Sequence, residues 1–386
     1  MNILVYKWDI FPYQDIINTF KKQGHSVDVL AFPIYNHLSD PDFEKALLHQ
    51  LQQTSYDLVF SVNYYTVIAV ICRNTAIPYA AWTCDSPLLS LQNESVLFST
   101  SYIFCFDRAQ YEDLIRRHAP HAFYLPLAGI ILPDSYDSEW KNTSAFSYDI
   151  SFVGNLYDKN RYDEMCEHLP DYLCGYMDAA IEAQLRICSG NLLPNMLNDD
   201  ILTQLQAYTT VEHGNASLEE LRIHFATTVL SYKAAAESRT GALNALSNTH
   251  AVHLFTTSDT RHIPCVHCHP AADYHTQAPR VFAQSKINLN FTIPNIENGI
   301  PLRVFDVLSA GGFLLTDYRE ELCQQFENQT DLVVFENTAD LLQKADYYLT
   351  HEKERQQIAK NGQKKVQHFH QYDQRLTKIL HSVFNL

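Results

Sequence analysis

Residues 290–317, with the sequence NFTIPNIENGIPLRVFDVLSAGGFLLTD, combine a helix start, two ionisable side chains and a pair of glycines. Pro301 suits the first turn of a helix, where its missing N–H costs nothing. Gly311 and Gly312 suit the end of that helix, before a strand over 313–316. The chain has only 11 glycines in 386 residues, roughly half of average usage. Two together therefore indicate a need for positive φ or for close backbone approach.

The two ionisable side chains of this helix, Arg303 and Asp306, are three residues apart and share one face near its N-terminus. A helix N-terminus offers free N–H groups and partial positive charge, and a guanidinium matches phosphate oxygens. A carboxylate such as Asp306 can accept from ribose hydroxyls. The alternative is a surface Arg–Asp pair on an ordinary helix. The glycine pair favours a site for the diphosphate and ribose of a nucleotide.

The same segment is part of a longer stretch that resembles a known family. The sequences SKINLNFTIPNIENGIPLRVFDVLSAGGFLLTDYREELCQQF and DLVVFENTADLLQKADYYLTHEKERQQIAKNGQKKV are similar to the C-terminal domain of spore-maturation-type (CgeB-like) glycosyltransferases. The resemblance runs from about residue 148, where YDISFVGNLYDKNR is the opening strand and loop, to about residue 375, and is specific in 285–317 and 358–362. It implies a GT-B fold, in which two Rossmann-like, doubly wound parallel-sheet domains face each other across a cleft. The second domain of such enzymes holds the nucleotide-sugar donor.

The resemblance therefore implies a glycosyltransferase with Arg303 and Asp306 at the donor. Many relatives carry two glutamates eight positions apart, whereas here Asn298 occupies the first place and Asp306 the second. Inverting and retaining transfer both stay open. The other donor-side candidates lie mainly in loops of the same domain: Gly154, Asn155, Tyr274, Asn290, Asn298, Gly299, Gly311 and Gly312. Of these, Tyr274 is expected at the base pocket, and Gly154 has a simple strand-to-helix turn as its alternative.

Apolar strand-like runs alternate with amphipathic stretches over the first 130 residues, which is the pattern of a parallel sheet with crossover helices. The predicted strands cover 2–6, 27–32, 58–62, 79–82, 102–106 and 123–125, and the predicted helices cover 13–22 and 109–118. The polar run 134–147 resembles a linker. We therefore expect an α/β protein with an N-terminal acceptor-side domain over 1–140 and a nucleotide-sugar-binding domain over 148–365.

Two helical regions complete the expected organisation. Residues from about 163 to 247 lack clear strands and predict a helical insertion that shapes acceptor access or a dimer contact. In the C-terminal stretch 363–384, the apolar side chains that fall near one helical face are Val366, Phe369, Leu376, Ile379, Leu380 and Val383. The resemblance implies that residues 366–386 cross back to the first domain. A terminal helix of the second domain is the alternative.

In open α/β sheets, ligands gather at the carboxyl ends of the strands. Asp9 follows the first predicted strand and Asp85 the fourth, and Trp8, Asn63 and Trp82 are the acceptor-side candidates near them. A carboxylate whose pKa is raised by burial can act as a general base on an acceptor hydroxyl, and tryptophans supply such an environment or stack on sugar rings. The alternatives are a helix cap for Asp9 and a turn for Asp85.

Composition limits the class of protein. With 386 residues, 46% hydrophobic and 12% aromatic, the chain has material for two cores. Its net charge of -16 argues against a nucleic-acid-binding protein. The first residues enter a strand directly, and no segment reaches ~18 uninterrupted apolar residues. We expect a cytoplasmic protein without a transmembrane segment, and the nine scattered cysteines suit a reducing compartment.

The segment CVHCH at 265–269 matches a haem-attachment pattern and offers zinc ligands. Covalent haem attachment requires export of the chain, and a structural zinc site requires a second pair of ligands. Neither is evident in the sequence. We interpret CVHCH as a loop of the nucleotide domain near the base pocket. No metal and no cofactor beyond the donor are expected, because Arg303 and the helix N-terminus can meet the donor's charge.

The sequence thus predicts transfer of a sugar from a nucleotide diphosphate donor to a protein, glycan or small-molecule acceptor. Arg303 would stabilise the leaving diphosphate, and Asp85 or Asp9 would activate the acceptor if the reaction inverts. Two alternatives remain: a nucleotide-sugar epimerase, and a non-catalytic protein that binds a nucleotide sugar or a partner.

Overall fold

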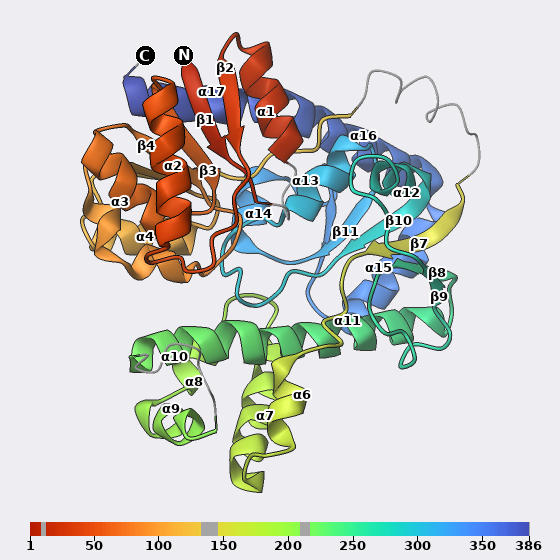
Figure 1. Ribbon diagram of the computed structural model, residues 1–386. Helices are drawn as coiled ribbons and strands as arrows, with labels where there is room; N and C mark the ends of the chain where they lie inside the picture. Colours follow the sequence, from red (N-terminus) through yellow and green to blue (C-terminus); the bar gives the residue numbers. More distant parts are fainter. Residues whose placement is uncertain (9–12, 133–145, 209–216, 386) are drawn as a thin grey trace. The chain divides into compact units, whose positions relative to one another are not determined.

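The computed structural model describes residues 1–8, 13–132, 146–208 and 217–385 (Figure 1). It consists of two compact units. Unit 1 comprises Met1–Ile131 together with Gln367–Leu386, and unit 2 comprises Leu132–Val366. Asp9 lies outside the described residues.

Unit 1 is built on a six-stranded parallel sheet in the order β2-β1-β3-β4-β5-β6. Its strands are β1 (Asn2–Tyr6), β2 (Ser26–Leu30), β3 (Leu58–Val62), β4 (Tyr79–Trp82), β5 (Ser101–Cys105) and β6 (Ala122–Tyr124). Its helices are α1 (Tyr13–Lys22), α2 (Pro41–Gln53), α3 (Thr66–Thr75), α4 (Arg108–Arg116), α17 (Tyr372–Phe384) and the short 3-10 turns η1 (Leu89–Gln92) and η2 (Glu94–Leu97). The central strand β3 is buried at every position, as expected for a strand covered on both faces.

Helix α17 packs against α1 within unit 1. The side-chain amide of Gln23, just after α1, donates to Asp373 Oδ1 at 2.9 Å and to Thr377 Oγ1 at 3.0 Å. Arg375 is buried and its Nε donates to the carbonyl of Pro126 at 2.9 Å. These bonds attach the C-terminal segment to the sheet that the N-terminal segment builds.

The prediction of one apolar helical face over 363–384 is wrong at Phe369. Phe369 is 64% exposed, because α16 (Glu352–Phe369) ends there and α17 begins at Tyr372 with a new direction. Val366 is buried in α16, whereas Leu376 and Ile379 are buried in α17.

Unit 2 has a second six-stranded parallel sheet, in the order β12-β11-β10-β7-β8-β9. Its strands are β7 (Tyr148–Val153), β8 (Val252–Phe255), β9 (His267–His269), β10 (Ser285–Asn290), β11 (Leu314–Asp317) and β12 (Val333–Phe335). The helices that follow the insertion are α12 (Ala278–Gln284), α13 (Leu302–Ser309), α14 (Glu320–Gln325), α15 (Thr338–Thr350) and α16. The chain builds β8 and β9 on one side of β7 and then returns to β10 on its other side. The strand order therefore reverses between β7 and β10, where such sheets bind ligands at the carboxyl ends of their strands.

The helical insertion lies between β7 and β8. It contains α6 (Arg161–Cys166), α7 (Asp171–Leu185), α8 (Leu193–Met196), α9 (Asp199–Gln206), α10 (Leu218–His224), a π-helical segment (Phe225–Ser231) and α11 (Tyr232–Ser247). Helix α11 runs along the sheet of unit 2, and α6 to α9 lie on its far side from that sheet (Figure 1). The insertion has an apolar core of its own, in which Met177, Leu202 and Phe225 are fully buried. Most element boundaries thus follow the sequence prediction within two residues, and the α/β class is confirmed.

The segment CVHCH is not the loop that we expected. Residues 267–269 form the edge strand β9, which pairs with β8. In the described parts of the chain, no helix has the length and apolar run needed to cross a bilayer.

Candidate functional site

Helix α13 begins directly after Pro301 and ends at Ser309. Gly311 follows it with a φ of +77°, the left-handed conformation that closes helices and that glycine adopts without strain. Gly312 is required for a different reason. A Cβ at this position would lie 2.7 Å from Asn288 Nδ2 and 2.8 Å from the carbonyl of Phe282. Both needs inferred from the glycine pair, positive φ and close approach, are therefore present.

Arg303 lies in the first turn of α13 with its side chain 25% exposed. Its Nη1 is buried without a hydrogen-bond partner and lies 3.6 Å from Asp306 Oδ2. The guanidinium packs over the ring of Phe282, at 5.1 Å from its centroid. A buried donor without an acceptor is costly unless a ligand supplies one. Arg303 therefore keeps one buried N–H without an acceptor beside its ion pair with Asp306.

Asp306 has its side chain 2% exposed and accepts a hydrogen bond from the Tyr274 hydroxyl at 2.8 Å. The carboxylate thus connects α13 to the loop before α12. Tyr274 and Asp306, both predicted donor residues, are brought together. In this arrangement the Asp306 carboxylate accepts from Tyr274. Its contact with a ribose stays a prediction.

Arg239 on α11 joins the candidate site and was not among the residues predicted from the sequence. Its Nη1 donates to the carbonyl of Asn155 at 2.6 Å, and its Nη2 donates to the carbonyl of Phe291 at 2.7 Å. These carbonyls follow β7 and β10, the two strands at which the sheet order reverses. The sequence signal that could have indicated Arg239 is a single arginine among mostly small residues, in the stretch AAAESRTGALNAL.

The environment of Arg239 is electrostatically unusual. Burial lowers the pKa of its guanidinium, the negative charge of Asp317 raises it, and the positive charge of Arg303 lowers it further. Its Nε is buried and has no hydrogen-bond partner. Arg239 and Arg303 therefore bring two positive charges to the same edge of the sheet.

The remaining donor-side candidates differ in burial and in their hydrogen-bond partners. Gly154 leaves no space for a side chain, since a Cβ would lie 2.9 Å from the ring of Phe152. Asn155 is exposed in the loop after β7, and its Oδ1 accepts from Ser258 Oγ at 3.2 Å. Asn290 is buried and donates to Thr316 Oγ1 at 2.9 Å, so it holds β10 to β11 instead of facing solvent. Asn298 is half-buried and Gly299 is buried in the loop that leads to Pro301.

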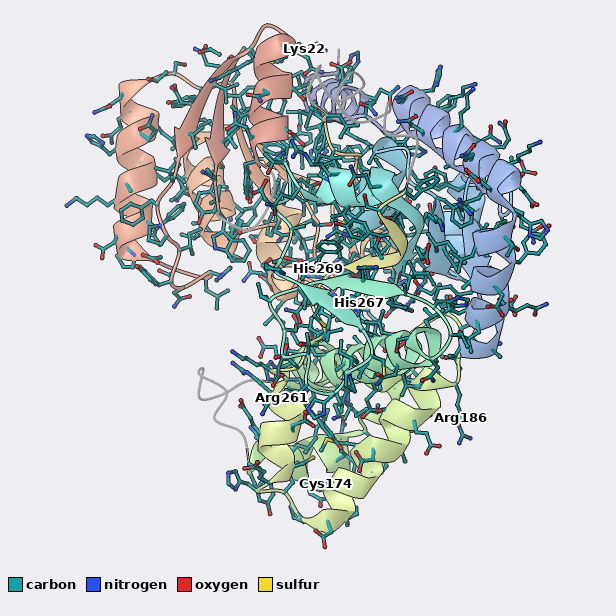
Figure 2. The ribbon with its side chains drawn as sticks, turned by 90° about the vertical axis from the view of Figure 1, so that its right-hand side faces the viewer. Lys22, Cys174, Arg186, Arg261, His267 and His269 are labelled. Atoms are coloured by element: carbon teal, nitrogen blue, oxygen red, sulfur yellow. The ribbon has the colours of Figure 1, made fainter. Side chains whose placement is uncertain are left out.

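The histidines of β9 gather around His253 on β8, and Figure 2 shows His267 and His269 on the edge strand. His253 Nδ1 lies 3.0 Å from His269 Nε2, and His267 stacks on His253 at 4.9 Å between ring centroids. Burial, followed by the charges of its two neighbours, lowers the pKa of His253. No cluster of three or more His, Cys, Asp or Glu side chains suited to a metal occurs among the described residues.

His269 also lines a cavity of about 330 Å³ beside the strand ends of unit 2. Tyr148, Phe255 and Arg280 are among its other lining residues. Its lining combines aromatic and apolar side chains with polar ones, among them Gln277 and Gln284.

In unit 1, Asn63 and Asp85 form a tight pair at the carboxyl ends of β3 and β4. Asn63 Nδ2 donates to Asp85 Oδ2 at 2.6 Å, and Asn63 Oδ1 accepts from the N–H of Cys84 at 2.9 Å and of Asp85 at 3.3 Å. Asn63 adopts a φ of 62°, a conformation that asparagine tolerates better than most residues. The two predicted residues therefore act as one unit.

The Asp85 carboxyl reaches solvent, yet desolvation by the surrounding protein raises its pKa. The hydrogen bond from Asn63 opposes that rise, because it favours the ionised form. The balance of these two effects leaves the pKa of Asp85 above its ordinary value.

The two tryptophans of unit 1 differ. Trp8 is 41% exposed, whereas Trp82 is 1% exposed and donates from Nε1 to the carbonyl of Leu125 at 3.1 Å. Trp82 also packs edge-on against Tyr372 at 6.0 Å. It cannot stack on a sugar ring, so that expectation is wrong for Trp82.

Comparison with known proteins identifies the class of fold. Residues 242–381 match a family model described as glycosyl transferase-like. The glycosyltransferase AviGT4 of avilamycin A biosynthesis is similar in structure, with a TM-score of 0.54 at 10% identity over 100% of this chain and 97% of that one. HepE from Anabaena, solved in complex with UDP, has a TM-score of 0.53 at 11% identity over 99% of this chain and 100% of that one. Sucrose-phosphate synthase from Thermosynechococcus elongatus has a TM-score of 0.51 at 11% identity, over 100% and 99% of the two chains.

These likenesses establish the fold: two six-stranded parallel sheets with flanking helices, as in GT-B glycosyltransferases. No curated protein sequence matches the chain.

Proposed function

We propose that the protein is a glycosyltransferase that takes a sugar from a nucleotide diphosphate donor held by unit 2. The observation that carries this proposal is the buried Nη1 of Arg303, which has no hydrogen-bond partner and lies in the first turn of α13, at a sheet edge that Arg239 also makes positive. The glycosyl transferase-like match over 242–381 and the UDP complex of HepE support it. The sequence resemblance to CgeB-like enzymes points to a narrower group within this class.

The donor diphosphate fits the charges of this site. As the glycosidic bond breaks, negative charge grows on the diphosphate, and Arg303 with the N–H groups of α13 stabilises it more than the intact donor. Arg239 adds positive charge at longer range. It also fixes the backbone just after β7 and β10 through its hydrogen bonds to the carbonyls there. This chemistry needs no metal ion. The cavity lined by His269 and Phe255 takes the nucleotide base.

The acceptor hydroxyl needs a base if the transfer inverts the anomeric centre. Asp85 is our candidate, with Asn63 as the residue that positions its carboxylate. Asp9 is the second candidate from the sequence. With retention, no such base is required, and the charge stabilisation by Arg303 carries the reaction.

Thermal shift with UDP-, GDP-, dTDP- and CMP-sugars tests the donor site, because a donor that binds the folded state raises the melting temperature. Arg303→Met removes the charge and the guanidinium contact with Phe282 but keeps a long, unbranched side chain. Arg186→Met is the matched control, since Arg186 is 75% exposed just after α7 and forms an ion pair with Glu182 (Figure 2). Stabilisation by one donor, lost in Arg303→Met and kept in Arg186→Met, is the expected result. No shift with any donor would overturn the proposal.

A second function, donor binding without turnover, is favoured by one observation. Asn298 stands where many relatives carry an acid, and Asp306 is committed to Tyr274. Nucleotide release separates the possibilities. A transferase releases nucleotide in the presence of acceptor, an epimerase keeps the nucleotide on its product, and a binding protein releases none.

A further inference from the structure

A groove of about 750 Å³ runs between α11 and two loops of unit 2. One loop follows β7 and the other follows β8. The side chains that line the groove come from one face of α11, from these loops and, in the case of Asp163, from α6: Leu156, Asp158, Lys159, Asn160, Asp163, Lys233, Ala236, Glu237, Thr240, Gly241, Asn244, Asp259, Arg261, His262 and Ile263. Its volume is within the range of small-molecule sites, about 300 to 1,000 Å³.

The groove exists because α11 presents small side chains to it. Ala236, Thr240 and Gly241 lie on the lining face, and a Cβ at Gly241 would meet nothing within 4 Å. Buried Leu156 and Ile263 contribute apolar surface to the lining. Figure 2 shows Arg261 projecting from the loop after β8, beside the helical insertion.

The charges of the groove are largely matched within it. Lys233 Nζ lies 2.7 Å from Asp163 Oδ1 and 3.5 Å from Glu237 Oε1. Arg261 lies 2.5 Å from Asp259. The lining carries one more carboxylate than cations, so it offers no surplus positive charge to a phosphate. It also contains no phenylalanine, tyrosine or tryptophan on which a nucleotide base could stack.

Paired carboxylates, ammonium groups and amides suit a different ligand. A sugar hydroxyl both donates and accepts, so each can bridge a carboxylate such as Glu237 and a donor such as Lys233. The groove is also joined to the candidate donor loop. Ser258 Oγ accepts from the N–H of Leu156 at 2.9 Å and donates to Asn155 Oδ1 at 3.2 Å.

We propose that this groove binds a neutral saccharide, as the part of a glycan acceptor that does not react. The assignment of the saccharide as an acceptor rests on the proposed transferase function, whereas saccharide binding itself does not. The helical insertion would then select the acceptor, because its helix α11 forms one wall of the groove.

The test is titration of the full-length protein with maltotetraose, cellotetraose, xylotetraose, mannotetraose and N,N′,N″,N‴-tetraacetylchitotetraose, followed by saturation-transfer NMR and calorimetry. Gly241→Trp fills the groove without displacing a neighbour of its Cβ. Gly175→Trp is the matched control, because Gly175 is an exposed glycine of α7 whose Cβ would also meet nothing within 4 Å, and it does not line the groove. Glu237→Gln, paired with Glu182→Gln on α7, tests the carboxylate separately.

At least one tetrasaccharide should bind the wild-type protein, and Gly241→Trp should weaken that binding by about tenfold or more, since a ligand cannot occupy filled space. Glu237→Gln should weaken it by a smaller factor, and both control variants should bind as the wild type does. The proposal is overturned if no tetrasaccharide binds at about 10 mM, or if Gly241→Trp binds as well as the wild type.

Donor thermal shifts recorded on the same samples distinguish failure of the saccharide groove from failure of the proposed transferase function. A donor shift without saccharide binding overturns the groove alone. Saccharide binding at the groove without any donor shift supports the groove and overturns the transferase function.

Discussion

The two candidate sites differ in how far their own residues satisfy them. In unit 1, Asp85 is held by Asn63, and the Asn63 amide oxygen is saturated by two backbone N–H groups. In unit 2, Arg303 has a buried nitrogen without a hydrogen bond, and the adjacent Asp306 is occupied by Tyr274. The hydrogen-bonding groups around Asp85 are thus satisfied within unit 1, whereas Arg303 keeps one buried N–H without an acceptor beside its ion pair with Asp306.

The largest expected effect comes from removing the Arg303 cation, whose Nη1 has no hydrogen-bond partner. Arg303→Met should lower kcat by about 10²- to 10³-fold, the usual loss when one group that stabilises developing negative charge is removed. Transfer assays with the donor selected by thermal shift measure it. Unchanged kinetics would show that the cation has a structural role only.

Asp85→Asn should lower kcat/KM by about 10²-fold or more if the transfer inverts, because general base catalysis contributes roughly that amount. The ionised carboxylate is the active form, so wild-type activity should rise with pH through the raised pKa of Asp85. That limb should disappear from the pH profile of the variant. A variant with full activity and an unchanged profile would remove Asp85 from the mechanism.

Asn63→Gly should have a smaller effect that separates positioning from catalysis. Glycine keeps the positive φ of 62° but loses the hydrogen bond to Asp85. Since that bond favours the ionised form, its loss should raise the pKa of Asp85 and move the activity limb to higher pH. A purely structural role would lower stability and leave the position of the limb unchanged.

Tyr274→Phe should have the smallest effect on catalysis and a measurable effect on stability. It leaves the buried Asp306 carboxylate without its 2.8 Å hydrogen bond, which should cost about 1 to 3 kcal/mol in the free energy of unfolding. Chemical denaturation measures this cost. Tyr35→Phe is a control for loss of a hydroxyl, because Tyr35 is 85% exposed in unit 1.

Much of the fold could be predicted because its signals are local. The run at Asn2–Tyr6 and the run at Leu58–Val62 are continuous and apolar, and the structure places strands over both. Pro301 and Gly311 mark the limits of α13 through backbone rules that need no tertiary information.

The parts that could not be predicted depend on contacts distant in the sequence. Arg239 holds a carbonyl 84 residues before it and another 52 residues after it. The hydrogen bond from Asn63 to Asp85 spans 22 residues. The edge strand at His267–His269 has no apolar alternation of its own, and only pairing with β8 makes it a strand.

The proposed role of Arg303 is to bind the diphosphate of a nucleotide-sugar donor. The most direct measurement is calorimetric binding of UDP, GDP and dTDP, each compared with its nucleoside, to the wild type and to Arg303→Met. We expect one diphosphate to bind more tightly than its nucleoside, and the variant to lose about tenfold or more of that advantage while nucleoside binding stays the same. An equal preference for the diphosphate in both proteins would contradict the claim.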